Sequence, residues 1–153
     1  MYPDCDEILK MAPDYDIIPV CREIYADVIT PITLLRKLAA VSKRYYLLES
    51  VEGGEKWGRY SFLGFDPVMR VKCSCGKVTI EKDGEETEKV TDKPLEVLRE
   101  ILKDYKAPRL AGLPPFAGGF VGYFAYAMIG YAEPKLKIKK GTFNDYDMML
   151  FDK

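Results

Sequence analysis

Residues 68–82 read Val-Met-Arg-Val-Lys-Cys-Ser-Cys-Gly-Lys-Val-Thr-Ile-Glu-Lys, and this stretch decides the fold class. Two β-rich runs, 68–75 and 77–82, flank Gly76, which is the pattern of an antiparallel hairpin. Asp83-Gly84 follows directly and gives a second turn signal. The middle of the chain is therefore predicted to form antiparallel strands joined by short turns.

Further strands are predicted on both sides of this hairpin. Residues 45–51 and 57–63 are β-rich and flank the turn signal Gly53-Gly54. Residues 17–25 are also expected to be extended, and Pro19 favours an edge position because proline cannot donate to a ladder. Two later segments are expected to be strands as well: the Gly- and aromatic-rich, buried residues 116–126, and residues 147–153.

Three helices are predicted. Residues 3–11 form a short one. Thr30 is the expected N-cap of a second helix, with Pro31 at its first position, and its buried stripe comprises Ile32, Leu35, Leu38 and Ala39. Asp92 is the expected N-cap of a third, with Pro94 in its first turn; its buried face comprises Leu95, Leu98, Ile101, Leu102 and Tyr105.

The order of these segments predicts an α+β fold. Strands at hairpin spacing and helices in separate blocks are typical of a largely antiparallel β-sheet with a few packed helices. A polar stretch, residues 85–91, leads to the third predicted helix, and a polar, basic stretch, residues 133–141, is expected to be an exposed loop. At 153 residues the chain is long enough for one domain, so residues 1–153 are expected to form a single domain.

Composition excludes several functional classes. Lys and Arg total 23 against 24 Asp and Glu, so no broad positive field exists to attract nucleic acid. No apolar run approaches the roughly 20 residues that cross a bilayer, and the acidic start lacks the layout of a secretory signal. We therefore expect a cytoplasmic protein with no membrane or nucleic-acid partner. The absence of histidine removes the commonest general base and metal ligand.

The four cysteines do not form a metal or redox motif. Cys73 and Cys75 lie two residues apart in a predicted strand, which would place both side chains on one face. The spacing differs from C-x-x-C, and Cys5 and Cys21 do not supply a second pair. Reduced thiols are therefore expected, and no metal site is predicted in this chain.

The most unusual string is Leu47-Leu48-Glu49-Ser50, followed by Val51-Glu52-Gly53-Gly54. An apolar strand that ends in an acid and a hydroxyl could pair with the ammonium group of an apolar amino acid. The alternative is a strand end that simply enters a polar turn. Arg59, between aromatic residues, could hold a carboxylate or could be stacked and structural.

Two other segments are interpreted as structural. Gly118-Gly119-Phe120-Val121-Gly122 lacks the lysine and the strand–loop–helix context of a phosphate loop. Its glycines are expected to let neighbouring backbone approach closely. The lysines at 135, 137, 139 and 140 are expected to form a solvated loop face.

Two strings carry a family resemblance. Residues 45–64 read Tyr-Tyr-Leu-Leu-Glu-Ser-Val-Glu-Gly-Gly-Glu-Lys-Trp-Gly-Arg-Tyr-Ser-Phe-Leu-Gly, and residues 116–126 read Phe-Ala-Gly-Gly-Phe-Val-Gly-Tyr-Phe-Ala-Tyr. They resemble the amino-terminal region of anthranilate synthase component I, and the likeness extends from about residue 17 to the end. Relatives usually carry an Asp and an Arg where this chain has Ala127 and Gly130.

The resemblance implies a function in tryptophan biosynthesis. Component I of this family converts chorismate and ammonia to anthranilate and pyruvate with Mg²⁺, and a glutamine amidotransferase subunit supplies the ammonia. The family's chorismate and Mg²⁺ sites lie in its carboxy-terminal part. This chain is therefore expected to hold no catalytic residue, to need no cofactor itself and to be inactive alone.

The resemblance also assigns a regulatory site. The family's Leu-Glu-Ser element lines the feedback pocket for L-tryptophan and maps onto Leu48, Glu49 and Ser50. The remainder of that pocket belongs to the other part of the family's chain, so weak tryptophan binding is expected here.

Other interpretations stay open at this point. Component I of aminodeoxychorismate synthase has a similar layout, and a free-standing amino-acid-binding module would have a self-contained pocket. The four apolar residues 148–151, close to the end of the chain, favour a truncated protein. A truncated protein would expose an apolar docking face and self-associate through it.

Overall fold

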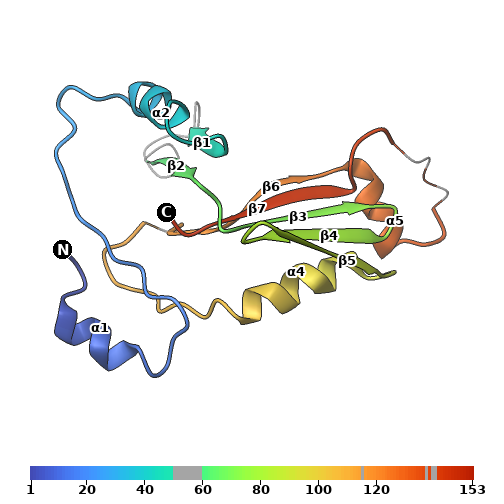
Figure 1. Ribbon diagram of the computed structural model, residues 1–153, viewed down its shortest axis with the longest axis horizontal. Coiled ribbons are helices and arrows are strands. Elements are labelled where there is room, and N and C mark those ends of the chain that lie inside the picture. The colour runs from blue at the N-terminus through green and yellow to red at the C-terminus, as the bar shows by residue number, and fades with distance from the viewer. Residues whose placement is uncertain (50–59, 115, 137, 139–140) are drawn as a thin grey trace.

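The computed structural model describes the whole chain except residues 50–59, 115, 137 and 139–140, and it has an α+β fold (Figure 1). A five-stranded antiparallel sheet dominates the molecule, and a second, two-stranded sheet lies beyond one end of it. The predicted fold class is therefore confirmed.

The larger sheet has the strand order β5-β4-β3-β7-β6, and every neighbouring pair is antiparallel. Its strands are β3 (Met69–Ser74), β4 (Lys77–Lys82), β5 (Glu85–Val90), β6 (Gly119–Phe124) and β7 (Tyr146–Phe151). The hairpin predicted around Gly76 is confirmed, with Ser74 paired to Lys77. Gly76 has a φ of 78°, a conformation that glycine adopts without steric cost.

The hydrophobic core lies between this sheet and one helix. Helix α4 (Pro94–Lys103) covers one face of the sheet, as Figure 1 shows, and buries Val97 and Leu98 against it. The alternate residues of β3 and β7 that point toward α4 are buried: Met69, Val71, Cys73, Tyr146, Met148 and Leu150. Each such side chain contributes about 1.5–3 kcal/mol by leaving water, so this layer is the main source of stability.

The smaller sheet pairs β1 (Tyr45–Glu49) with β2 (Ser61–Phe65) in antiparallel register. Helix α2 (Pro31–Ala39) precedes it and packs next to it. The Thr30 hydroxyl accepts a hydrogen bond from the Thr33 N–H, so the predicted N-cap is confirmed. The strand predicted over residues 68–75 begins one residue later than expected, at Met69, and ends at Ser74.

Short helices complete the chain. Helix α1 (Cys5–Met11) confirms the predicted first helix and begins with a capping box between Asp4 and Glu7. A 3₁₀ turn, η1 (Tyr126–Met128), and helix α5 (Ile129–Ala132) follow β6 and were not predicted. In the part of the chain that the structure describes, no helix has the length and apolarity to cross a bilayer.

One predicted strand is wrong, and one observed strand was not predicted. Residues 17–25 form no strand; Cys21 makes a single bridge to Tyr2, and Tyr25 is almost fully exposed. The β-branched residues of this segment do not make it a strand, because no described strand lies beside it to form a ladder. No strand was predicted in the polar stretch 85–91, yet Glu85–Val90 form β5, since the Asp83-Gly84 turn returns the chain beside β4.

Several burial predictions are also wrong. Helix α2 buries no residue: Ile32 and Ala39 are exposed, and Leu35 and Leu38 are half-buried. The small sheet covers only part of the apolar stripe, so periodicity alone overstated the burial. In α4 the expected Leu98 is buried and Leu95 and Ile101 pack partly against the core, but Leu102 is exposed. Tyr105 also packs partly against the core, although it lies beyond the end of α4.

Three local details differ from expectation. The N-cap of α4 is Lys93, whose N–H donates to the Thr91 hydroxyl, and Asp92 makes no cap.

The two cysteines of the central hairpin do not share a face. Cys75 lies outside β3 with a φ of 54° and is exposed, while Cys73 is buried. Strand β6 was predicted to be buried, but Tyr123 and Phe124 are exposed because β6 is at the sheet edge.

Candidate functional site

The candidate effector strand, β1, is oriented by a turn built on a buried serine. The Ser42 hydroxyl donates to the carbonyl oxygen of Arg44 at 2.9 Å and accepts from the Arg44 N–H at 3.2 Å. Ser42 is 5% exposed. The Arg44 carbonyl oxygen also accepts from the Asp66 N–H at 3.0 Å, so these hydrogen bonds tie the turn between α2 and β1 to the end of β2.

Glu49 is the last residue of β1 and is exposed. It lies opposite Ser61 in β2, and the Ser61 hydroxyl lies 3.4 Å from the Glu49 Oε1 atom, a long hydrogen bond. Within the described residues Glu49 forms no ion pair. A carboxylate held at a strand end in this way can accept a hydrogen bond from a cationic ligand.

Leu48 and Glu49 point to opposite faces of the small sheet, because side chains alternate along a strand. Leu48 lies opposite Phe62 and shares the face of Tyr46, and its side chain is 48% exposed. The carboxylate is therefore not on the same wall as the apolar side chain. Ser50, the third predicted residue, lies outside the described residues.

The Leu48 face of the small sheet meets the large sheet through aromatic rings. Tyr46 and Phe151 lie edge to face with ring centroids 4.7 Å apart, and Phe62 and Phe116 do so at 5.6 Å. These four rings line a cavity of about 180 Å³ together with Gly118 and its neighbours. Burial raises the pKa of Tyr46 above its ordinary value. This aromatic seam is an apolar surface next to the predicted effector element.

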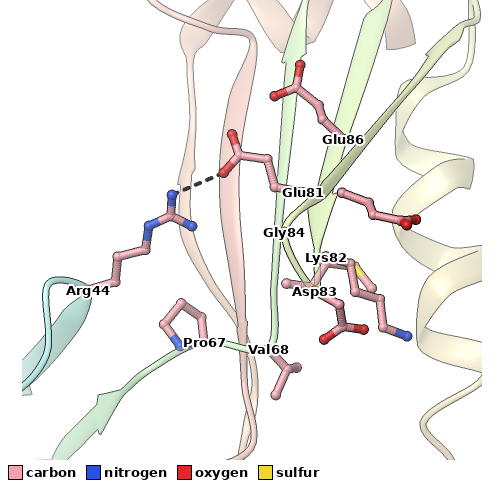
Figure 2. A pocket seen from close by; sticks show the side chains of 10 residues that line it. Arg44, Pro67, Val68, Glu81, Lys82, Asp83, Gly84 and Glu86 are labelled. Atoms are coloured by element: carbon pink, nitrogen blue, oxygen red, sulfur yellow. Dashed lines mark hydrogen bonds and ion pairs between the residues drawn. The ribbon is translucent and has the colours of Figure 1, made fainter.

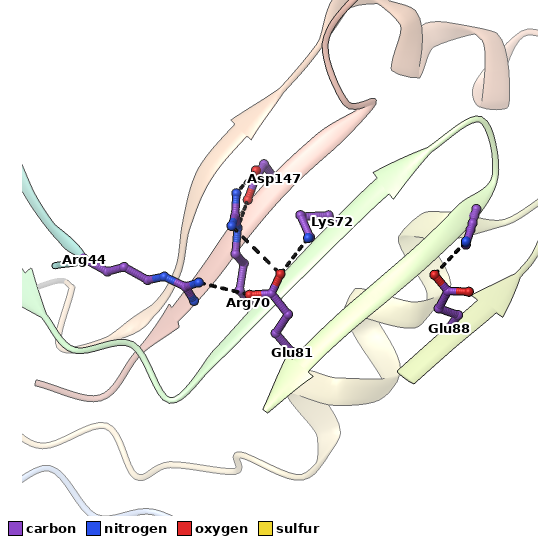
Figure 3. Close-up of polar contacts among 7 residues, drawn as sticks. Arg44, Arg70, Lys72, Glu81, Glu88 and Asp147 are labelled. Atoms are coloured by element: carbon purple, nitrogen blue, oxygen red, sulfur yellow. Dashed lines mark hydrogen bonds and ion pairs between the residues drawn. The ribbon is translucent and has the colours of Figure 1, made fainter. Parts of the chain in front are cut away.

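A charged network joins the two sheets on the opposite face of the large sheet from α4. Glu81 accepts from Lys72 at 2.6 Å and from Arg44 at 3.1 Å, and Arg70 binds Asp147 through two nitrogens at 2.8 and 2.6 Å (Figure 3). The hydrogen bond from Lys72 is the main reason that the pKa of Glu81 is lowered. The hydrogen bond with Asp147 raises the pKa of Arg70. Since Arg44 directly precedes β1, this network links the candidate effector strand to the large sheet.

A polar cavity of about 370 Å³ lies beside the Arg44–Glu81 ion pair, at the β4–β5 turn (Figure 2). Its acidic lining residues are Glu81, Asp83, Glu85 and Glu86, and its basic ones are Arg44 and Lys82. Glu81 is already neutralised by its partners. The described residues place no group of three or more acidic or cysteine side chains where they could hold a metal ion.

A buried carboxylate that the sequence did not reveal holds the other end of the large sheet. Asp145, 8% exposed, accepts from the Cys75 N–H at 2.7 Å and from the Tyr131 hydroxyl at 2.7 Å. The Cys73 thiol lies 3.6 Å from the same oxygen, and burial raises its pKa to about 11. Asp145 thus fastens the β3–β4 turn to α5. No motif signalled it, because its partners are 14 and 70 residues away.

The other candidate segments have structural explanations where they are described. A Cβ atom on Gly118 would lie 2.9 Å from the Phe151 carbonyl oxygen, and one on Gly122 would lie 2.0 Å from that of Asp147. The prediction that these glycines permit close backbone approach is confirmed. Arg59 lies outside the described residues, as do Lys137, Lys139 and Lys140.

The two positions that depart from the family pattern lie after β6. Ala127 is in η1 and Gly130 is in α5. A Cβ atom at position 130 would meet Ile138 at 3.5 Å, which is an ordinary contact distance. Glycine is therefore not required there by space.

Comparison with known proteins finds relatives that share one name. The chain is 46% identical over 133 residues to anthranilate synthase component 1 of Acetivibrio thermocellus, which covers 86% of this chain and 26% of the relative. It is 43% identical over 133 residues to the protein of that name from Pseudomonas aeruginosa, covering 86% and 27%. The Aquifex aeolicus protein is 35% identical over 147 residues, covering 95% and 29%.

No family model matches the chain. The relatives found by pairwise similarity are components of a synthase. All three named here are anthranilate synthase component 1 proteins. The resemblance inferred from residues 45–64 and 116–126 is therefore confirmed over most of the chain. The chain spans between a quarter and three tenths of the length of these relatives.

Proposed function

We propose that this chain is the amino-terminal, regulatory part of an anthranilate synthase component I, and that the end of β1 contributes to an L-tryptophan effector site. Leu48, Glu49 and Ser50 are the residues to which we assign effector binding. The observation that carries the proposal is the 46% identity over 133 residues to a protein named anthranilate synthase component 1.

The described geometry supports an amino-acid effector at this strand end. Glu49 is exposed, and its carboxylate can accept from an ammonium group. The aromatic seam next to Leu48 offers apolar surface to an indole ring, because aromatic rings stack favourably edge to face or offset. The ion pair between Arg44 and Glu81 holds β1 against the large sheet.

We assign chemistry to the longer protein rather than to this chain. The relatives are about four times as long as the matched region, and the family's reaction joins chorismate and ammonia to give anthranilate and pyruvate with Mg²⁺. In the proposal, Mg²⁺ and chorismate bind outside these 153 residues, and a glutamine amidotransferase subunit is the partner of the longer protein. The purified chain should therefore form no fluorescent anthranilate from chorismate, ammonium and Mg²⁺.

Calorimetric titration with L-tryptophan tests the effector site. The intact chain should bind tryptophan weakly, near 1 mM, and L-phenylalanine less well, because part of the family's pocket lies elsewhere. Glu49→Ala should weaken binding by about tenfold or more, since a hydrogen bond to a charged group contributes roughly 1.5–3 kcal/mol. Glu86→Ala, which removes an exposed acid on β5, is the matched control.

Either of two results would contradict this proposal. One is the absence of saturable heat with tryptophan for the intact chain. The other is equal loss of binding in the Glu49→Ala and Glu86→Ala variants, because that would make the effect one of net charge rather than of position.

A further inference from the structure

The two-stranded sheet is held against the five-stranded one by individual contacts rather than by a core. In the described part of the small sheet only Gly64 is buried. The contacts that join the two sheets or their flanking residues include two edge-to-face ring pairs, one backbone hydrogen bond and one ion pair: Tyr46–Phe151, Phe62–Phe116, Phe65–Lys153 and Arg44–Glu81. Loss of one such contact should therefore change how firmly β1 is held.

Arg44 connects the small hairpin to the large sheet. It directly precedes β1, and its carbonyl oxygen accepts from the Ser42 hydroxyl at 2.9 Å and from the Asp66 N–H at 3.0 Å. Its guanidinium donates to Glu81 of β4 at 3.1 Å (Figure 3). The backbone of Arg44 is thus fixed to the small hairpin while its side chain is fixed to the large sheet. Among the described residues, no other ion pair makes this connection.

Glu81 is an acceptor that the large sheet holds in place. Lys72 of β3 donates to it at 2.6 Å, and an Arg70 nitrogen lies 3.9 Å from it. Arg70 is itself bound through two nitrogens to Asp147 of β7. These contacts keep the Glu81 carboxylate with the large sheet when β1 shifts. Displacement of β1 therefore breaks the ion pair with Arg44, and the intact pair favours one position of the strand.

We propose that the Arg44–Glu81 ion pair holds β1 in the position in which the effector binds, and so regulates effector affinity from outside the site. This inference rests on the proposed function. Arg44 and Glu49 are five residues apart, which is roughly 16–17 Å along an extended strand. Arg44 is therefore a positioning residue and does not contact a ligand held by the Glu49 carboxylate.

The exposure of the ion pair limits the size of the effect. The side chains of Arg44 and Glu81 are 43% and 23% exposed, and solvent weakens a partly exposed ion pair. The apparent affinity falls in proportion to the fraction of chains whose site is competent to bind. Loss of the pair should therefore weaken L-tryptophan binding by about two- to fivefold. The coupling is reciprocal, so bound tryptophan should also hold β1 more firmly.

NMR titration with L-tryptophan, a method suited to weak binding, tests the proposal. Arg44→Ala should raise the dissociation constant by about two- to fivefold. Arg44→Lys keeps the charge and should recover part of the loss. Glu81→Gln should weaken binding by a similar factor, and the double variant Arg44→Ala/Glu81→Gln no further, because each single change already removes the pair.

Lys77→Ala is the matched control for net charge. Like Arg44→Ala, it removes one cation from an ion pair of β4, here the pair with Glu88 at 2.6 Å. Lys77 makes no described ion pair with the small sheet, so its loss should leave tryptophan binding unchanged. Circular dichroism checks that each variant folds.

Hydrogen exchange without ligand tests the position of β1 by itself. Arg44→Ala should speed exchange of the β1 amides and leave those of β3 and β7 unchanged. Lys77→Ala should leave the β1 amides unchanged. If β1 exchanges at the same rate in Arg44→Ala as in the unmodified chain, the ion pair does not hold the strand, and the inference is overturned whether or not tryptophan binds.

The binding results separate this inference from the proposed function. Failure of the unmodified chain to bind tryptophan would contradict the effector site itself, and its regulation with it. Binding by the unmodified chain and equal binding by Arg44→Ala would overturn the regulatory role alone. So would equal weakening by Lys77→Ala and Arg44→Ala, or a double variant that binds far more weakly than either single variant.

Discussion

The two sheets of this protein are stabilised in different ways. The five-stranded sheet buries alternate residues of β3 and β7 beneath α4, and Val71, Cys73 and Tyr146 have no exposed surface. Among the described residues of the two-stranded sheet Gly64 alone is buried, and the helix beside it, α2, buries none. The small sheet instead depends on the aromatic seam and on the Arg44–Glu81 ion pair.

The buried core that stabilises the fold and the candidate effector strand β1 therefore lie in different sheets. A region with few buried apolar contacts opens at lower free energy than a packed core, and ligand-binding elements are commonly found in such regions. Leu48 and Glu49 are in the small sheet, so the larger sheet can fold as a scaffold while β1 responds to a ligand.

The largest expected effect comes from removing one aromatic ring from each sheet. Tyr146→Ala should lower the free energy of unfolding by about 3–5 kcal/mol, because the ring is fully buried and its hydroxyl donates to the Pro94 carbonyl. Tyr46→Ala should cost about 1–2 kcal/mol, since its ring is half-buried. Urea denaturation measures both. Equal losses would contradict the contrast between the sheets.

The next effect concerns the buried carboxylate of the large sheet. Asp145→Ala should cost about 2–3 kcal/mol, because it leaves the Cys75 N–H and the Tyr131 hydroxyl without an acceptor. Tyr131→Phe removes one of these hydrogen bonds and should cost less. If thermal denaturation finds Asp145→Ala neutral, the carboxylate does not fasten the β3–β4 turn.

A smaller effect is expected at the start of α2. Thr30→Ala removes the hydroxyl that accepts from the Thr33 N–H, and losing such a cap costs about 1 kcal/mol. Because α2 has no buried residue, the loss should appear mainly as faster hydrogen exchange in α2 and β1. Thr30→Ser, which keeps the hydroxyl, is the control. Uniform acceleration in β3 and β7 would contradict this assignment.

The smallest effect is a dependence on pH at the link between the sheets. The pKa of Glu81 is lower in the folded chain than in the unfolded one, where it is near 4.3, so its stabilisation is present above that value. It should be lost as the pH falls through the lowered pKa. The contribution should stay below about 1 kcal/mol, as the partners are partly exposed. Glu81→Gln should remove this part of the acid dependence of unfolding, and an unchanged profile would count against it.

Local patterns predicted much of the larger sheet. The Gly76 and Asp83-Gly84 turns and the two β-rich runs around Gly76 identified β3 and β4, since turn residues and strand composition act over a few positions. Thr30 and Pro31 located the start of α2 for the same reason. Residues 17–25 were wrongly predicted as a strand because a strand also needs a neighbour, which composition does not reveal.

The candidate site was predicted only in part. Leu48 and Glu49 lie in β1, as expected, but strand alternation places them on opposite faces. The ion pairs of Glu81 with Arg44 and of Arg70 with Asp147 join residues 37 and 77 positions apart, and no sequence spacing indicated them.

The sequence by itself determined the fold class, the central hairpin, the cap of α2 and the likeness to anthranilate synthase component 1. Each of these depends on neighbouring residues or on strings that can be read along the chain. Only the tertiary structure decided which apolar stripes are buried and which strands form the edges of the large sheet. It also decided which donors bind the carboxylates of Asp145 and Glu81. Burial and ion pairing depend on residues that folding brings together, and their partners are far apart in sequence.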